Sequence, residues 1–421
     1  MIKKKYNKLN NTVYEEVLEN GLRIYICPLK RKNIYAEMNV LYGAKNISFK
    51  KEEDQEFIKT YTGTAHFLEH LIYTPDGDFN PAKIYNKNAA SNNAYTNKNL
   101  TTYYFYGPLN FEENLNTLLR SVNSLNITEK DVDKERGIIK QELLKYADNK
   151  SFIAKTKALE NAIVEDSYRY DTGGRIEDLE KIDLQMIKTC FEYFYRPDNM
   201  FLIIAGNVNP QKVIVQVKEF YQNKKFPKFK VIRKKYNEPA KVLKEKEIIH
   251  KDTSNNYISI TYKIKKPKID EYLLRVYLNA ILRLKFGPLT KIYNSTYQDS
   301  SYVSDIDYGV TLIDDYALIC FDVIVRNNPE KTIDLIDDTL KHAEINEDYI
   351  EIYKKLMIKT IILDFESPDR VASLIENDCL RYNHPIYDIY DKIKSLDVLD
   401  YQNFTKTLDF SNRNYVIVGK K

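Results

Sequence analysis

The chain has 421 residues, of which 43% are hydrophobic and 29% are charged. This composition is typical of a soluble globular protein, and the length exceeds what one ordinary hydrophobic core accommodates, so two to three domains are expected. The 64 basic and 60 acidic residues leave a net charge of +4, which creates no strong field, and we therefore expect neither nucleic acid nor a membrane as a partner.

The first eight residues are basic, but no apolar segment of a signal peptide follows them, and no stretch of the chain reaches 18 apolar residues. The four cysteines lack C-x-x-C spacing, which argues against a disulfide framework. We therefore predict a cytoplasmic location. The abundance of Lys, Asn, Ile and Tyr, without any Trp, suggests the AT-rich genome of a bacterium.

Three strands are predicted near the start of the chain. Residues 12–18 and 22–27 are joined at Asn20-Gly21, a dipeptide that strongly favours a tight β-hairpin. A third strand is predicted at residues 34–42. Residues 45–59 are polar and charged, and we expect them to form a loop.

The segment 62–73 (TGTAHFLEHLIY) holds two of the five histidines of the chain. In a helix, His66 and His70 project from the same face one turn apart, so both imidazoles could reach one metal ion. Glu69 lies on that face as well, where its carboxylate could take a proton from a water molecule. The alternative is a core helix that carries two hydrogen-bonded histidines and no metal.

Residues 94–106 are rich in tyrosine and threonine and are predicted to form a strand. At the edge of a sheet, such a strand could hold a peptide by backbone pairing, a mode that does not depend on side-chain identity. Asn93 could help to align that peptide. An ordinary turn asparagine is an equally good interpretation of Asn93 from the sequence alone.

A further helix with candidate metal ligands is predicted at residues 128–146. Thr128 and Asp131 resemble a capping box at its start. Glu135 and Glu142 are seven residues apart, two turns along one face, so one could bind the ion while the other supports a ligand. A glutamate pair on a charged helix usually faces solvent, and this pair gains significance only beside two histidines. Zinc in catalytic sites has three protein ligands and one open position.

Three motifs follow one another over about eighty residues: HFLEH, NNAYTNKNLTTYYF and ERGIIKQE. Together they resemble the inverted-zinc-motif metallopeptidases, the family of pitrilysin, insulysin and the mitochondrial processing peptidase. In that family, H-x-x-E-H is followed about seventy to eighty residues later by a ligand glutamate, which is itself seven residues after another glutamate. Glu142 lies 72 positions after His70 and seven after Glu135, in agreement with this pattern.

The resemblance implies a role for each residue of the motifs. It identifies one Zn²⁺ per chain as the cofactor and an unfolded peptide as the substrate. The implied zinc ligands are His66, His70 and Glu142, the general base is Glu69, the carboxylate that supports a ligand is Glu135, and the substrate-binding residues of the edge strand are Asn93 and Ala94.

The second half of the sequence repeats the first. Residues 199–206 reappear as 414–419, and the start of the helix at 128–146 reappears from residue 345 onward. A period close to half the chain length indicates duplicated domains rather than a solenoid. We predict a zinc-binding domain at residues 1–225, a charged linker at 226–240 and a second homologous domain at 241–421.

No H-x-x-E-H occurs in the second half, so no metal site is predicted there. Its three histidines are isolated and are expected to be surface or packed residues: His250, His342 and His384. The predicted fold class is α+β, with two duplicated domains, each a mainly antiparallel sheet flanked by helices. The resemblance implies that the two domains form half of a clamshell.

The resemblance also points to a second subunit. In single-chain relatives, an arginine and a tyrosine seven residues later hold the substrate carbonyl from a domain of the non-metal half. Tyr302 matches that tyrosine, but Ser295 occupies the position of the arginine. Because this chain is half the length of insulysin-like enzymes, we expect a partner that is either a second copy or a related chain without zinc ligands, and Ser295 favours the related chain.

The predicted function is a zinc metallopeptidase subunit that hydrolyses unfolded peptides, in the processing or degradation of peptides or leader peptides. The alternative is a non-catalytic scaffold subunit of the same family, like the core subunits of respiratory complexes. Scaffold subunits typically lose residues of H-x-x-E-H, whereas His66, Glu69 and His70 are all present here.

Overall fold

The computed structural model describes residues 1–290, 292–294, 302, 304, 306–342, 344 and 347–420. The chain divides into two compact units. The first unit consists of Met1–Gln141, Asp171–Lys234 and Ile358–Ile393, and the second of Glu142–Tyr170, Lys235–Met357 and Lys394–Lys421. One boundary falls inside the predicted linker at 226–240. The first half of the sequence also contributes Glu142–Tyr170 to the second unit, and the second half contributes Ile358–Ile393 to the first unit.

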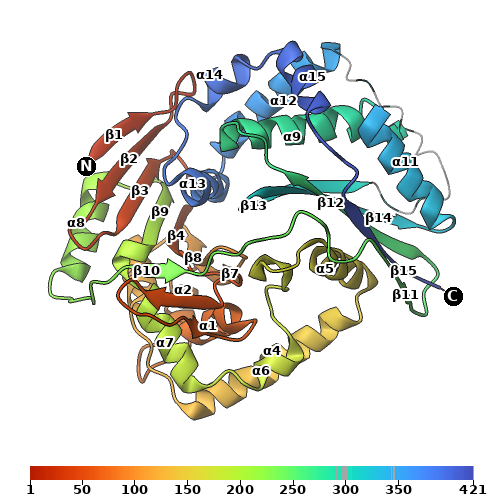
Figure 1. Cartoon of the computed structure of the whole chain (residues 1–421). Coiled ribbons are helices and arrows are strands. Elements are labelled where there is room, and N and C mark those ends of the chain that lie inside the picture. Colours follow the sequence, from red (N-terminus) through yellow and green to blue (C-terminus); the bar gives the residue numbers. More distant parts are fainter. Residues whose placement is uncertain are drawn as a thin grey trace. The chain divides into compact units, whose positions relative to one another are not determined.

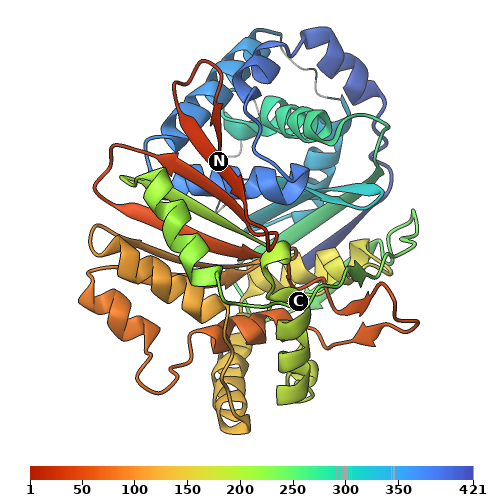
Figure 2. The same cartoon turned by 90° about the vertical axis from the view of Figure 1, so that its left-hand side faces the viewer.

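The first unit is built on a seven-stranded sheet with the order β1-β2-β3-β9-β4-β8-β7. All neighbours are antiparallel except β3 and β9. The predicted hairpin at Asn20-Gly21 is confirmed, with Gly21 at φ 91° and the amide of Leu18 bonded to the carbonyl of Leu22. The first three strands lie side by side in both views (Figures 1 and 2). The strands are β1 (Ile2–Lys5), β2 (Thr12–Val17), β3 (Arg23–Pro28), β4 (Ile34–Val40), β7 (Ser91–Thr96), β8 (Thr101–Gly107) and β9 (Met200–Gly206).

Helices cover both faces of this sheet. Successive residues of a strand point to opposite faces, and on β7 the side chain of Tyr95 bonds to Glu376 of α13 while that of Thr96 bonds to Glu69 of α1. The helices α1 and α13 therefore lie on opposite faces. The described α-helices of this unit are α1 (Thr64–Ile72), α2 (Pro81–Lys87), α3 (Phe111–Val122), α6 (Ile176–Leu179), α7 (Leu184–Phe194), α8 (Pro210–Tyr221), α13 (Pro368–Tyr382), most of α4 (Glu129–Ala147) and of α14 (Ile389–Lys394), and the end of α12 (Glu347–Asp364).

The prediction of a loop at residues 45–59 is wrong. A small antiparallel sheet with the order β10-β5-β6 forms there, from β5 (Ser48–Lys51), β6 (Ile58–Lys59) and β10 (Val231–Arg233). Phe49 is fully buried and packs against Tyr193 and Phe194 of α7. One buried aromatic among lysines and glutamates produces no alternating pattern, which explains why the strand escaped prediction.

The same sheet fixes part of the predicted linker. The strand β10 lies within residues 226–240 and pairs with β5. Its Arg233 guanidinium bonds to the carbonyl of Leu41 and, over 3.0 Å, to Oδ1 of Asn199. This part of the linker therefore belongs to the first unit as an ordered strand.

The second unit is built on a five-stranded sheet with the order β11-β15-β12-β14-β13. Its first pair is parallel and the others are antiparallel, the same order and directions as β3-β9-β4-β8-β7. The predicted α+β duplication is confirmed by this topology. The strands are β11 (Lys246–His250), β12 (Asn256–Lys265), β13 (Asp307–Ile313), β14 (Tyr316–Val325) and β15 (Arg413–Gly419).

The helices α5 (Lys150–Ala162) and α13 occupy corresponding positions in the two halves of the sequence, but each packs on the sheet built from the other half. The helix α5 packs on β12 and β15 of the second unit, and α13 packs on β4 and β9 of the first (Figure 1). The other helices described in the second half are α9 (Glu271–Phe286), α11 (Pro329–His342), α12 (Glu347–Asp364), α14 (Ile389–Lys394) and α15 (Val398–Lys406). None of the described helices combines the length and the apolar character needed to cross a bilayer.

Candidate metal centre

The helix α1 begins at a turn that admits only glycine at two positions. Gly63 precedes the helix at φ 85°, and a Cβ there would lie 2.4 Å from the carbonyl oxygen of Gly173. A Cβ added at Gly174, where φ is 83°, would lie 2.5 Å from the amide nitrogen of Gly63. The hydroxyl of Thr62 donates to Asp178 over 2.7 Å and accepts the amide N–H of Arg175 over 2.9 Å. The loop around residues 171–178 thus holds the first turn of α1 in place.

The motif residues occupy one side of α1. The opposite side is apolar and buried, through Ala65, Phe67, Leu68, Leu71 and Ile72. His66, Glu69 and His70 are only partly buried. The Nε2 atoms of His66 and His70 lie 3.2 Å apart. The predicted helical pairing of the two imidazoles is therefore present in the structure.

The third predicted ligand joins them from α4. Glu142 follows directly on Gln141, the last residue that this helix contributes to the first unit, so the helix itself carries Glu142 toward the histidines. One ligand atom from each of His66, His70 and Glu142 lies within 4.8 Å of the other two. No other group of this kind occurs among the residues that the structure describes.

This cluster fits zinc in donor chemistry and in spacing. Two nitrogens that each lie about 2.0–2.1 Å from a tetrahedral zinc are roughly 3.3 Å apart, close to the 3.2 Å found here. Two imidazoles and one carboxylate are a ligand set that catalytic zinc commonly uses. Burial, and then the charge of His70, lowers the pKa of His66 to about 4. His66 is therefore neutral at physiological pH, as a metal ligand requires.

Glu135 lies where the sequence predicted, beside a histidine of the cluster. Its Oε1 is 2.9 Å from Nδ1 of His70, while Nε2 of the same ring faces His66. The start of α4 is also as predicted, because Asp131 accepts both the amide N–H and the hydroxyl of Thr128, over 2.8 and 2.7 Å. The helix thus presents two carboxylates, two turns apart, toward α1.

The carboxylate of Glu69 has a partner that sequence reasoning missed. The hydroxyl of Thr96, on β7, donates to Oε2 of Glu69 over 2.6 Å. A signal was available, because Thr96 follows Ala94 by two residues on the predicted strand and therefore shares its face. The bond fixes one oxygen of Glu69 and links the metal helix to the end of β7.

The strand β7 is the last strand of its sheet, so the predicted edge position of Asn93 and Ala94 is present in the structure. It pairs with β8 on one side, and no described strand pairs with its outer side. Asn93 is exposed, and its side-chain oxygen accepts the amide N–H of Ala94 over 2.9 Å. The predicted single strand at 94–106 is in fact this edge strand and its neighbour β8, joined by residues 97–100.

The other predicted substrate residue belongs to the second unit. Tyr302 forms an isolated bridge with Val325, and its partly buried ring packs against the core of that unit. Ser295, which stands where the family pattern has arginine, lies outside the described residues. Because Tyr302 and the two histidines belong to different units, the proximity of Tyr302 to the metal cluster stays a prediction.

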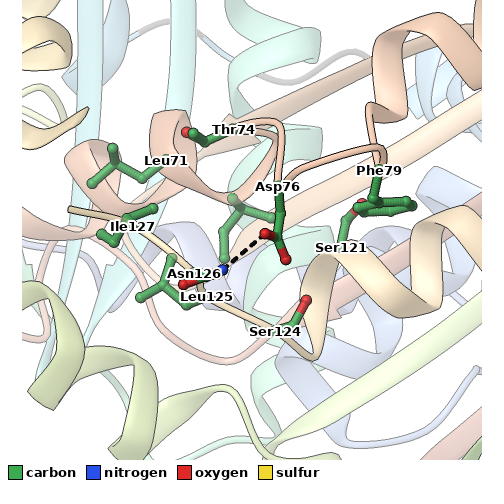
Figure 3. A pocket seen from close by; sticks show the side chains of 10 residues that line it. Leu71, Thr74, Asp76, Phe79, Ser121, Ser124, Leu125, Asn126 and Ile127 are labelled. Atoms are coloured by element: carbon green, nitrogen blue, oxygen red, sulfur yellow. Dashed lines mark hydrogen bonds between the residues drawn. The ribbon is translucent and has the colours of Figure 1, made fainter. Parts of the chain in front are cut away.

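A small cavity lies beyond the carboxyl end of α1 (Figure 3). Its volume of about 10 Å³ suits at most one water molecule. Leu71 and Ile127 line it, and beside them the side-chain amide of Asn126 donates to Asp76 over 2.8 Å (Figure 3). The residues around this cavity thus connect the chain after α1 to the turn before α4. These two helices carry the cluster.

Two partly buried histidines and a carboxylate, with a further carboxylate on the helix of the histidines and a strand edge beside it, are an arrangement typical of metal-dependent hydrolases. The model of the insulinase family, peptidase family M16, matches residues 58–176, and the model of the peptidase M16 inactive domain matches residues 181–357. The chain belongs to peptidase family M16, the family of pitrilysin, insulysin and the mitochondrial processing peptidase.

Several similar proteins of known sequence or structure are bacterial. The uncharacterized zinc protease YmfH of Bacillus subtilis is 31% identical in an alignment of 413 positions that covers 94% of each chain. The crystal structure of an M16-like peptidase from Alicyclobacillus acidocaldarius superposes with a TM-score of 0.91 at 21% identity, over 99% of this chain and 100% of the other. The periplasmic protease PqqL of Escherichia coli has a TM-score of 0.73 at 16% identity, and this chain spans 48% of its length. At these identities the two structures show the fold alone.

Proposed function

We propose that the chain is the zinc-binding subunit of a metallopeptidase that hydrolyses unfolded peptides. The observation that carries the proposal is the convergence of His66, His70 and Glu142 within 4.8 Å, with Glu69 on the same helix as the two histidines. Relatives named as zinc proteases and the match of the insulinase model to residues 58–176 support it.

The residues present divide the chemistry among themselves. His66, His70 and Glu142 would hold zinc, which supplies Lewis-acid polarisation when bound. Glu69 is the general base that takes a proton from the attacking water and passes it to the leaving amine. Thr96 orients Glu69 by its 2.6 Å hydrogen bond, and Glu135 orients His70 by the contact to Nδ1.

The substrate would bind along β7. An extended peptide can add to the outer side of this edge strand by main-chain hydrogen bonds, next to Thr96 and therefore next to Glu69. The amide N–H of Ala94 now bonds to the side chain of Asn93. A peptide that pairs with Ala94 would replace that bond, so Asn93 keeps the strand edge satisfied until substrate arrives.

A second subunit is part of the proposal. In PqqL, a chain about twice as long, the part similar to this chain covers 48% of the length. A partner of related fold would complete the assembly here, either a chain without zinc ligands or a second copy, and Ser295 in place of the family's arginine favours the chain without ligands. A bacterial cytoplasmic location accompanies this proposal.

A scaffold role is the competing candidate, because residues 181–357 match the model of the M16 inactive domain. The five motif positions from His66 to Glu142 argue against it, since a scaffold does not need a general base. Zinc analysis and peptide hydrolysis distinguish the two functions. We expect about one zinc per wild-type chain, clear loss of zinc in His70→Ala, and retained zinc without hydrolysis in Glu69→Gln.

The assay is best run with and without the related gene product, on a library of unstructured peptides. Hydrolysis by the pair and weak hydrolysis by the isolated chain support the heteromer. Full activity of a chain that light scattering shows to be monomeric removes the case for any second subunit. Zinc-free protein under non-chelating conditions, or hydrolysis that survives Glu69→Gln, overturns the enzymatic assignment.

A further inference from the structure

A buried polar network lies on the face of the first sheet opposite α1 and takes no part in the proposed chemistry. At one end is Glu37, in the middle of β4 and only 1% exposed, and at the other is Glu376 of α13, 5% exposed. Burial, and then repulsion from Glu376, raises the pKa of Glu37 to about 8. Burial raises the pKa of Glu376 as well. Two carboxyl groups thus share a dry site.

Hydrogen bonds connect this site to the edge strand. Tyr95 of β7 donates its hydroxyl to Oε2 of Glu376. Tyr95, Thr102 and Asn39 are register neighbours across β7, β8 and β4. The hydroxyl of Thr102 donates to Oδ1 of Asn39 over 2.6 Å, and the amide of Asn39 donates to Glu37 over 3.1 Å. One row of polar side chains therefore runs from the edge of the sheet to its centre.

The other groups around the pair do not neutralise it fully. Tyr35 of β4 donates a hydrogen bond to Glu37, and Arg381 of α13 favours the ionised form of Glu376 from an exposed position. On β9, the residues in register with Glu37 and Asn39 are the apolar Ile203 and Phe201. Two anions with one distant cation are unfavourable in such surroundings, so the pair keeps one proton at neutral pH.

We propose that Glu37 and Glu376, acting through Tyr95, are positioning residues for the edge strand β7, which they hold in place while the pair keeps a proton and loosen as that proton is lost. The inference rests on the proposed function to the extent that β7 receives the peptide. The helix α13 lies beyond residue 357, where the matched family models end. The positioning role is thus assigned to a segment that those models do not cover.

The hydrogen bonds of the row depend on which of its groups are protonated. Burial, and then the charges of Glu37 and Glu376, raises the pKa of Tyr95, so its hydroxyl remains a donor. An edge strand has hydrogen-bonded neighbours on one side only, and its order therefore depends on such additional bonds. When the second carboxyl group ionises above about pH 8, repulsion favours separation of α13 from β4, which breaks the bond to Tyr95.

The direction of the pH effect follows from the difference in proton binding between the closed and the open form. The pKa of Glu37 is raised from 4.5 to about 8, so the folded network binds a proton that the open form has already released. The closed form therefore loses stability as the pH rises between these values, and the loss is complete above the higher one. The strand should therefore be most ordered in acidic solution, near or below pH 4.5, and lose order progressively up to about pH 8.

Hydrogen exchange of the amides of residues 91–96 tests this directly on the full chain, without substrate. After correction for the intrinsic rate, Tyr95→Phe should exchange about tenfold faster than wild type at pH 7, as expected for the loss of one partly buried hydrogen bond to a carboxyl group. Wild type should approach that rate at pH 9, whereas Glu37→Gln should keep its protection. Tyr104→Phe makes the same chemical change on β8, on the same sheet face, and should exchange like wild type.

The exchange of β13 in the second unit serves as an internal standard. Equal protection of residues 91–96 in wild type at pH 7 and pH 9, or equal effects of Tyr95→Phe and Tyr104→Phe, overturns the inference. Glu376→Gln supplies a second variant if Glu37→Gln does not fold. Because exchange needs neither zinc nor turnover, a negative result here is separate from a failure of the proposed peptidase function.

Kinetics provide the second readout once an active preparation exists. Tyr95→Phe should raise KM for an unfolded peptide several-fold and leave kcat within about twofold of wild type, because the bond positions the strand and does not touch the reacting atoms. A fall in kcat at unchanged KM contradicts a positioning role in binding.

Discussion

Oε1 of Glu135 lies 2.9 Å from Nδ1 of His70. Because Nδ1 is held by this carboxylate, Nε2 is the nitrogen left to face His66, 3.2 Å away. A carboxylate in this position fixes the ring orientation and increases its basicity as a metal ligand. In the proposed function the two glutamates of α4 therefore have different tasks: Glu142 would bind the ion, and Glu135 would support a ligand.

Glu142→Ala should remove most of the zinc affinity, since it deletes one of three protein ligands. Glu135→Ala should weaken binding by about 10- to 100-fold, the usual effect of losing a group that supports a ligand. Competition with a chelating dye measures both constants, and Glu129→Ala, at an exposed position of the same helix, is the control. If Glu135→Ala proves the more damaging variant, the two roles are reversed.

Thr96→Val should retain zinc and reduce kcat by about tenfold. The substitution keeps the size of the side chain and removes the hydroxyl that bonds to Glu69 over 2.6 Å, a charge-assisted bond worth about 1.5–3 kcal/mol. Thr96→Ser restores the hydroxyl and should recover most of the rate. A Thr96→Val enzyme with wild-type kcat would show that Glu69 needs no orientation from β7.

Gly63→Ala should lower both stability and zinc occupancy. The added methyl would lie 2.4 Å from the carbonyl of Gly173, at a φ of 85° that L residues rarely adopt, so the turn before α1 must shift. Gly137→Ala is the matched control, because a Cβ at that position of α4 meets nothing within 4 Å. Helix propensity predicts that the control stabilises the protein by about 0.5–1 kcal/mol. Urea unfolding and metal analysis report the two effects.

Glu238→Gln should destabilise the second unit by about 3–5 kcal/mol. Glu238 and Lys263 form an ion pair with 3% and 0% of their side chains exposed, and the same carboxylate accepts the amides of Val164 and Asp166. Removal of its charge leaves the buried ammonium of Lys263 with neutral partners, among them the carbonyl of Lys241 and the ring of Tyr316. Lys263→Met in the Glu238→Gln background should recover part of the loss, and strict additivity of the two substitutions would argue against a coupled pair.

Asp378→Asn should stabilise the protein more as the pH rises. Burial raises the pKa of Asp378 from 3.8 to about 6, so the folded state loses stability through this residue between those pH values and regains none above them. Asparagine avoids the buried charge and can still accept the amide of Ile386. The advantage of the variant should grow to about 3 kcal/mol by pH 7, measured by urea unfolding at several pH values. A difference that does not change with pH contradicts the assignment.

Short-range patterns in the sequence sufficed for the elements that carry the site. The spacing of His66 and His70 predicts α1, and that of Glu135 and Glu142 places two carboxylates on one face of α4, because a helix fixes these relationships locally. The topology of the two sheets confirms the repeat seen in the sequence. The strand period indicated that Thr96 shares the face of Ala94, but its bond to Glu69 joins segments 27 residues apart and no local pattern identifies that partner.

Other features depend on tertiary contacts that no local pattern encodes. The strand around Phe49 is identified by its packing on α7 and not by alternation, and the pairing of β10 with β5 joins segments about 180 residues apart in the chain. The exchange of α5 and α13 is of the same kind. An amphipathic pattern predicts that one face of a helix is buried. It does not indicate which of two similar sheets buries that face.

The exchange of α5 and α13 between the two sheets affects how the chain folds during its synthesis. Strands β4 and β9 of the first unit are complete by residue 206, but the helix that packs on them, α13, starts only at Pro368. At about 5–20 residues per second, a ribosome needs roughly 10–30 s to reach it. During that time this sheet face stays open, with the apolar Phe201 and Ile203 uncovered and Glu37 without its partner Glu376. The nascent chain should therefore depend on chaperone shielding in that interval, and separately expressed halves should aggregate rather than fold.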